Sequence, residues 1–162
     1  MDRLWAPWRT QYISKVGSMK GCIFCSKLKA GGDKAARIIR RSKHSFSVLN
    51  IFPYNNGHLM VVPYRHVSDL TKLTDEELLD MCKLLNRTQK MLEKALKPDG
   101  FNIGVNIGRS AGAGVRGHVH IHIVPRWNGD VNFMPVFTGS KVISQSLDAL
   151  YAKLIKCSRA KK

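Results

Sequence analysis

The chain has 162 residues, of which 44% are apolar and 23% charged, a composition typical of one soluble packed domain. This balance excludes a collagen-like, low-complexity or mainly disordered protein. The charge is unusual, because 27 Lys and Arg against 11 Asp and Glu give a net charge of +16. Such a charge favours polyanionic or phosphorylated ligands. No apolar run is long enough to span a membrane, and residues 1–10 lack the apolar stretch of a secretory signal. We therefore expect a cytoplasmic protein.

The positive charge is concentrated in residues 20–43, where Asp33 is the single acid, and in residues 153–162, which contain no acid. Two functional interpretations are open at this point. The stretch can be a footprint for nucleic acid, or it can create a general field that attracts a phosphorylated small substrate. For the tail, a solubilising extension is the simpler interpretation.

The hydrophobic pattern predicts an α+β domain. Residues 1–19 contain Trp5 and Trp8 without a clear period, so we expect an arm packed by its aromatic side chains. Residues 48–51 and 59–62 are short apolar runs joined by a turn-rich link, which predicts two adjacent strands. A capping-box sequence at residues 74–77, followed by apolar residues at helical spacing, predicts a helix over about 75–96.

Two more strands and a second helix are predicted in the rest of the chain. Residues 101–107 and 119–124 alternate apolar with polar or small residues, as half-buried strands do, and a glycine-rich loop joins them. A helix is predicted from about 142 to 155. We see no internal repeat and no linker, so one domain with a core over residues 20–145 and a C-terminal helix and basic tail over 142–162 is expected.

Four cysteines in a chain of this length do not make a disulfide framework. Cys22 and Cys25 form a Cys-x-x-Cys pair, whose two thiolates can reach one tetrahedral metal. A zinc site needs two further ligands, and no second such pair exists. A redox pair is the alternative. Cys82 is interpreted as a core residue and Cys157 as incidental.

The residues with the clearest chemistry are a row of three histidines, His118, His120 and His122, which alternate with apolar residues. On a strand these imidazoles would share one face, while the apolar residues cover the other. The row can serve catalysis, or it can itself chelate a metal. Before it, residues 106–117 are rich in Gly and Ala, which allows backbone N–H groups to surround an anion; a flexible connector is the alternative. His58 can reach the same phosphates or be a structural histidine.

The histidine row resembles the signature of the histidine-triad (HIT) family. The match to its diadenosine tetraphosphate phosphorylase and hydrolase branch covers most of residues 20–145 and extends to Trp5, Pro7, Trp8 and Arg9. It includes Asn50, residues 55–63, Asn106, Ala111-Gly112, residues 125–127 and residues 139–143. The resemblance implies an antiparallel sheet of about five strands and a homodimer. One departure is that residues 113–117 lack the Gln and the Ser or Thr that many HIT proteins have after the Ala-Gly pair.

The resemblance also implies roles for individual residues. His120 would be the nucleophile that forms a nucleotidyl-histidine, His122 would contact phosphate oxygens, and His58 would help neutralise the phosphates or the leaving group. Asn50 would bind the ribose. The phosphate contacts would come from Asn106, Ser110 and the amides of Gly112 and Ala113. Leu49 and Met60 would flank a purine, or they belong to the core.

In family members with a Cys-x-x-Cys pair, zinc is held by those thiolates and two histidines. The corresponding residues here are Cys22, Cys25, His66 and His118. Such an S2N2 set fills a tetrahedral site with no open position, so one structural zinc per chain is expected.

Taken together, the residues and the resemblance predict an enzyme that cleaves a dinucleoside polyphosphate or a related mononucleotide through His120, by phosphorolysis or hydrolysis. One alternative is a HIT hydrolase that removes adenylate from nucleic-acid ends, with the basic stretch as its docking surface. The other is a zinc-containing nucleic-acid-binding module. We do not favour this module, because Cys25 and His66 lie much farther apart than the ligands of a zinc finger.

Overall fold

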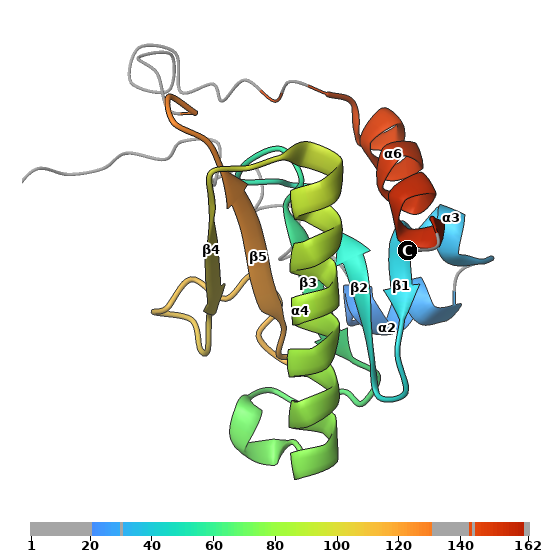
Figure 1. Ribbon diagram of the computed structural model, residues 1–162. Helices are drawn as coiled ribbons and strands as arrows, with labels where there is room; N and C mark the ends of the chain where they lie inside the picture. Colours follow the sequence, from blue (N-terminus) through green and yellow to red (C-terminus); the bar gives the residue numbers. More distant parts are fainter. Residues whose placement is uncertain (1–20, 30, 131–142, 144, 161–162) are drawn as a thin grey trace, which may run out of the picture.

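The computed structural model describes residues 21–29, 31–130, 143 and 145–160. Within these ranges, five strands form one antiparallel sheet in the order β1-β2-β3-β5-β4 (Figure 1). The strands are β1 (Ile38–Arg41), β2 (Ser45–Leu49), β3 (Leu59–Pro63), β4 (Gly100–Val105) and β5 (Ile121–Arg126). The helical segments are α2 (Ile23–Lys29), α3 (Asp33–Ala36), η1 (Leu70–Lys72), α4 (Asp75–Leu96) and α6 (Leu147–Arg159). The predicted α+β class with about five strands is confirmed.

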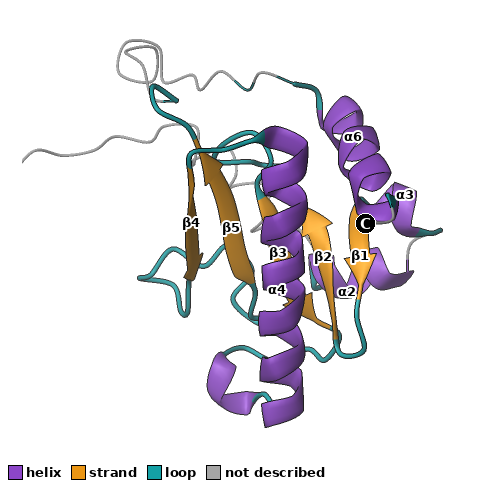
Figure 2. Cartoon of the chain, viewed as in Figure 1, coloured by secondary structure: helices purple, strands orange, loops and turns teal. Residues whose placement is uncertain are grey.

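Helices cover the two faces of the sheet unequally (Figures 1 and 2). Successive strand residues point to opposite faces, so each face has its own core. On one face, Leu49, Leu59 and Ile123 pack with residues of α4 and α6. On the other, Phe24 of α2 packs with Val48 and Met60. Among the described residues, no β4 or β5 side chain joins this second cluster, which leaves that half of the face to the histidine row.

The predicted strands are present, with shifted ends. β2 ends at Leu49 and not at Ile51, because the Asn50 side chain accepts a hydrogen bond from the Phe52 N–H and turns the chain. β5 runs from Ile121 to Arg126, so it begins and ends later than the expected 119–124. The pattern did not locate β1, whose sequence Ile-Ile-Arg-Arg does not alternate.

The predicted long helix is confirmed as α4. The Thr74 side chain accepts a hydrogen bond from the Glu77 N–H, and the Glu77 carboxylate accepts one from the Thr74 N–H, so the expected capping box is formed. The helix ends at Leu96, before Lys97 adopts a left-handed conformation and Pro98 follows. Its buried stripe includes Met81, Leu84, Met91 and Leu92. The interpretation of Cys82 as a core residue is wrong, because Cys82 is exposed beside this stripe.

The C-terminal helix begins later than predicted. α6 runs from Leu147 to Arg159 and not from 142 to 155, because Ser146 caps it by accepting a hydrogen bond from the Ala149 N–H. Its buried residues Leu150 and Leu154 pack on the sheet. The predicted arm over residues 1–19 and most of the motif over 139–143 lie outside the described residues.

None of the described helices combines the length and the apolar character needed to cross a bilayer.

The capping box of α4 predicts a pH-dependent contribution to stability. Hydrogen bonds from Arg65 and from the Thr74 N–H lower the pKa of Glu77 from 4.5 to about 2. A depressed carboxyl pKa stabilises the fold above pH 4.5, and this stabilisation is lost as the pH falls toward 2. We expect Glu77→Gln to lower the free energy of unfolding by about 1 kcal/mol at pH 7. The effect is modest because the partner Arg65 is half exposed and water screens its charge.

Urea unfolding of both proteins between pH 7 and pH 3 measures this difference, which should narrow below about pH 4.5. Glu93→Gln is the matched control on the same helix, where Glu93 accepts a hydrogen bond from Gln89. If the difference in free energy of unfolding between Glu77→Gln and the unmodified protein stayed constant over this pH range, the assigned role of the carboxylate would be contradicted.

Candidate active site and metal centre

The three histidines of the row lie at the start of β5. His118 and His120 precede the strand, and His122 lies within it. His122 pairs with Met60 of β3 and Gly104 of β4. The ring centres of His120 and His122 are 4.7 Å apart, and those of His58 and His122 are 5.1 Å apart. The structure thus brings the three predicted catalytic histidines together.

His120 is held as a neutral imidazole with one free lone pair. Its ring is 4% exposed and Phe24 lies 5.0 Å away. Its Nδ1 is 2.9 Å from the carbonyl oxygen of His118, which can only accept, so Nδ1 carries the proton. Burial lowers the pKa of His120, which also favours the neutral ring. The second nitrogen, Nε2, therefore keeps the lone pair that a nucleophile needs.

His58 and His122 form a hydrogen-bonded pair whose protons can also be placed. The Tyr54 N–H donates to Nδ1 of buried His58 at 3.0 Å, so the proton of His58 is on Nε2. Nε2 of His58 lies 2.9 Å from Nδ1 of His122 and donates to it. A neutral His122 then carries its own proton on Nε2 and can offer it to an anion.

Asn50 lies beside His58. Its Nδ2 is 3.2 Å from Nδ1 of His58, and its Oδ1 accepts from the Phe52 N–H at 2.9 Å. Its backbone N–H donates to the His58 carbonyl at 3.0 Å. The family resemblance implied a ribose contact for Asn50, and its hydrogen bond to the His58 ring was not predicted.

The glycine-rich loop begins where β4 ends. Val105 pairs with Ile121, so Asn106 and His120 leave the same end of the two strands. Ser110 is exposed. The amides of Gly112 and Ala113, expected to face a phosphate, donate to loop carbonyls at 3.0 and 3.2 Å. An anion at these amides would have to share or replace those turn bonds.

Leu49 and Met60 occupy core positions. Leu49 is fully buried in the cluster with α4 and α6, on the face opposite His122. Met60 is 5% exposed and packs in the cluster that contains Phe24. These are contacts that core residues make, and the alternative role of Leu49 and Met60 beside a purine stays a prediction.

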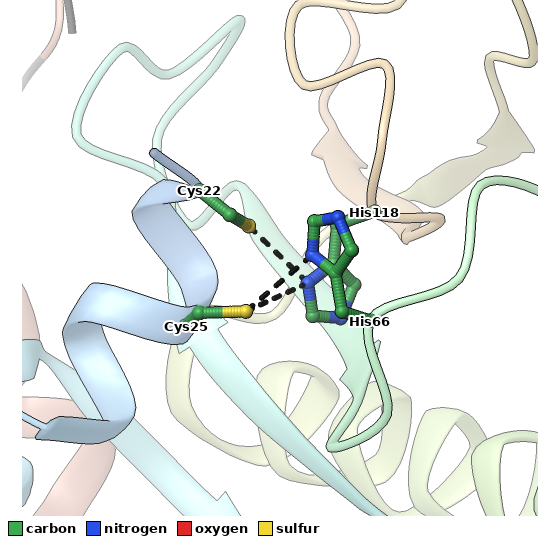
Figure 3. A group of neighbouring side chains, drawn as sticks. All are labelled: Cys22, Cys25, His66 and His118. Carbon is green, nitrogen blue, oxygen red and sulfur yellow. Dashed lines mark hydrogen bonds between the residues drawn. The ribbon is translucent and has the colours of Figure 1, made fainter. Parts of the chain in front are cut away.

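Cys22, Cys25, His66 and His118 converge at one point (Figure 3). The pair of cysteines comes from the start of α2, His66 follows β3, and His118 precedes β5. One potential ligand atom from each residue lies within 4.8 Å of all the others. His120 and His122 are not part of this group, so the described geometry does not support a metal held by the row alone.

The geometry of this group fits a tetrahedral ion. Sulfur and nitrogen ligands of one zinc ion lie about 3.5 Å apart. Here the Cys22 Sγ is 3.3 Å from Nδ1 of His118, and the Cys25 Sγ is 3.4 and 3.7 Å from Nδ1 of His66 and of His118. Nε2 of His118 donates to the Pro63 carbonyl at 2.9 Å, which leaves Nδ1 unprotonated toward the sulfurs. A Cβ on Gly117 would lie 3.1 Å from Nε2 of His66, so a glycine here leaves room for that ring.

Two residues of the site were missed by sequence reasoning. Gly104 pairs with His122, and a Cβ on Gly104 would meet nothing within 4 Å, so open space lies beside the imidazole. A glycine inside a strand is the signal that could have found it. Tyr54 is 38% exposed, and its ring lies 4.7 Å from His58 and 5.8 Å from His122. Its place in a turn-rich link gave no comparable signal.

Part of the basic stretch makes structural contacts. Arg37 pairs with Asp148 of α6 at 2.9 Å, and Arg41 pairs with Asp33 at 2.8 Å. The Lys27 ammonium donates to the Ala36 carbonyl at 2.7 Å. These cations are therefore already partnered within the fold, which weakens the case for the whole stretch as a nucleic-acid footprint.

The model of the HIT domain family matches residues 32–129. The chain belongs to the HIT domain family, as its histidine row indicated.

Known relatives are similar over most of the chain. A Mycobacterium tuberculosis protein named AP-4-A phosphorylase is 39% identical over 154 residues, which cover 91% of this chain and 79% of the relative. The asymmetrical bis(5'-nucleosyl)-tetraphosphatase of Schizosaccharomyces pombe is 35% identical over 108 residues, 67% of this chain and 57% of that protein. A hypothetical histidine triad nucleotide-binding protein of Sulfolobus tokodaii has a similar structure, with a TM-score of 0.67 and 28% identity, covering 85% of this chain and 89% of that one.

Proposed function

We propose that this chain is an enzyme that cleaves dinucleoside polyphosphates such as diadenosine tetraphosphate at the α-phosphate. The observation that carries the proposal is the buried, neutral His120, whose Nδ1 proton is bound by a carbonyl and whose Nε2 retains its lone pair. The names of the two relatives support the substrate class, since one is a phosphorylase and the other a hydrolase of such compounds.

In the proposed reaction, Nε2 of His120 attacks the α-phosphorus. A phosphorus–nitrogen bond forms as the bond to the bridging oxygen breaks, and the remaining nucleoside polyphosphate leaves. Inorganic phosphate or water then attacks the nucleotidyl-histidine and restores the free ring. The Nε2 proton of His122 would stabilise the charge on a phosphate oxygen, with His58 holding His122 in that orientation.

The remaining contacts belong to the same proposal. Asn106 and Ser110 would bind phosphate oxygens at the mouth of the loop, together with Gly112 and Ala113 once their turn bonds are exchanged. Asn50 would bind the ribose through a side chain that also contacts His58. Gly104 leaves the face beside His122 open for the nucleotide.

Incubation with diadenosine tetraphosphate, with and without inorganic phosphate, tests the proposed function. ATP plus ADP formed only with phosphate would identify a phosphorylase, whereas AMP plus ATP would identify a hydrolase. Two ADP would require cleavage between the β-phosphates and would contradict attack at the α-phosphorus. We expect His120→Ala to lower the rate by about a thousandfold or more and to abolish the covalent intermediate.

His44→Ala is the matched control, because His44 lies in the turn between β1 and β2 and belongs neither to the histidine row nor to the group around Cys22. Normal turnover by His120→Ala would contradict the mechanism. The same assay with 5'-adenylated DNA tests the alternative substrate, and a clear preference for that DNA would replace the proposed substrate by a nucleic-acid end.

We also propose that the group around Cys22 holds one structural zinc. When bound, the ion would tie the start of α2 to the segments after β3 and before β5, with all four positions filled by protein. We expect about one equivalent of zinc in untreated protein and a large loss in His66→Ala, but not in His44→Ala. Elemental analysis measures this. Less than about a third of an equivalent in the unmodified protein would contradict a resident zinc.

A homodimer through β4 is the third part of the proposal, following from the family resemblance. β4 is the last strand in the order of the sheet, and Ile103 on it is 47% exposed. Pairing of two β4 edges would cover this side chain. We expect sedimentation equilibrium to give twice the mass of the chain, and Ile103→Lys to shift the protein toward monomer; a monomeric unmodified protein would contradict the proposal.

A further inference from the structure

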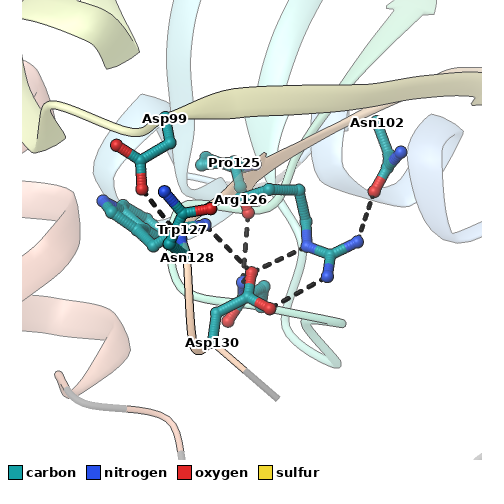
Figure 4. Close-up of polar contacts among 8 residues, drawn as sticks. Asp99, Asn102, Pro125, Arg126, Trp127, Asn128 and Asp130 are labelled. Carbon is teal, nitrogen blue, oxygen red and sulfur yellow. Dashed lines mark hydrogen bonds and ion pairs between the residues drawn. The ribbon is translucent and has the colours of Figure 1, made fainter.

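A buried carboxylate lies at the end of β5 that is remote from the glycine-rich loop (Figure 4). The side chain of Asp130 is 7% exposed, and its two oxygens accept from Nε and Nη2 of Arg126 at 2.7 and 2.9 Å. The Trp127 N–H donates to the same carboxylate at 3.1 Å. Arg126 in turn donates to Asn102 of β4 at 2.6 Å. Asp130 is therefore anchored to the sheet on one side.

On its other side, Asp130 holds the turn that leads into β3. Nδ2 of Asn55 donates to the Asp130 carboxylate at 2.7 Å and to the Pro125 carbonyl at 3.1 Å. Asn55 is 6% exposed. A charged acceptor in a buried setting makes a stronger hydrogen bond than a neutral one, so this contact fixes the Asn55 side chain.

The same turn carries the groups that orient His58. The Asn55 carbonyl accepts from the His58 N–H at 3.2 Å, and the neighbouring Tyr54 N–H donates to Nδ1 of the His58 ring. At Gly57 the turn packs closely against α4, since φ is +79° and an added Cβ would lie 2.5 Å from the Leu96 side chain. A shift of Asn55 would therefore alter the bond that keeps the proton of His58 on Nε2.

We propose that Asp130 is a positioning residue, which acts through Asn55 to hold the turn that fixes the proton positions of His58 and His122. The inference rests on the proposed function of these two histidines. The route from Asp130 to the rings passes through the Asn55 side chain and the backbone of residues 54–58.

An ionised carboxylate suits this role because it offers acceptors alone. The groups directed at it, from Arg126, Asn55 and the Trp127 backbone, are all donors. In Asp130→Asn, the new amide NH2 would face at least one of them and leave a buried donor without an acceptor. The variant keeps the size of the side chain, so its effect reports on hydrogen bonding rather than on volume.

The test compares Asp130→Asn with Asp99→Asn. Asp99 is exposed and accepts the Asn128 N–H at 2.7 Å in the same turn region, whereas the Asn55 side chain donates to Pro125 and Asp130. We expect Asp130→Asn to lower kcat for diadenosine tetraphosphate about tenfold or more, with KM changed less than about threefold, because misplaced catalytic groups lower the rate. Asp99→Asn should match the unmodified protein in both constants.

Nitrogen-15 NMR of the imidazole rings provides a readout that needs no substrate. The unmodified protein should show the Nε2–H form for both His58 and His122, and Asp130→Asn should show a mixture of ring forms. Asn55→Ala provides a second route, since it breaks the contact with the turn but keeps the ion pair between Asp130 and Arg126. It should reproduce the change in the spectrum.

Unchanged imidazole spectra in both folded variants would overturn the proposal, and so would a loss of thermal stability with kcat preserved. If the unmodified protein does not cleave diadenosine tetraphosphate, the proposed function fails, while the spectra still decide the positioning role. Changed spectra in Asp130→Asn but not in Asp99→Asn would support it.

Discussion

The hydrogen bond from Nδ1 of His120 to the carbonyl of His118 is the contact on which the site depends. It fixes which nitrogen of His120 has the lone pair. The ring of the same His118 faces the sulfurs of Cys22 and Cys25, and its Nε2 is bound to the Pro63 carbonyl. One residue thus supplies a backbone acceptor to the proposed nucleophile and a side-chain ligand to the proposed metal centre. A displacement of His118 would disturb both.

Backbone groups define the protonation of His118, His120 and His58, and the His58 ring then defines that of His122. A carbonyl can only accept and an amide N–H can only donate, so each imposes one form on the imidazole it contacts. The carbonyls of Pro63 and His118 place protons on His118 and His120, whereas the Tyr54 N–H excludes a proton from one nitrogen of His58.

Local patterns in the sequence were sufficient for the elements that depend on local interactions. The capping box and apolar spacing located α4, and alternation placed the histidines on one side of β5. β1 was not predicted, because its arginines find their partners on α6 and α3, and no local pattern reveals such contacts. For the site, residue types and resemblance indicated the histidines and cysteines. The contacts of Asn50 and Asp130 were not predictable, since they join segments whose relative position arises only on folding.

The two edge strands of the sheet, β1 and β4, differ in their surroundings, and the difference explains part of the large positive charge. At β1, Arg37 pairs with Asp148 of α6, Arg40 donates to the Ser158 carbonyl, and the Tyr151 hydroxyl donates to the Ile38 carbonyl. Arginines there fasten α6 along an edge that would otherwise be open. At β4, the edge presents Ile103 instead. Cations that cover one edge act as structural residues, so net charge alone is a poor guide to a nucleic-acid partner. Within the described residues β4 pairs with β5 alone, and its other edge is where the proposed second copy of the chain would join.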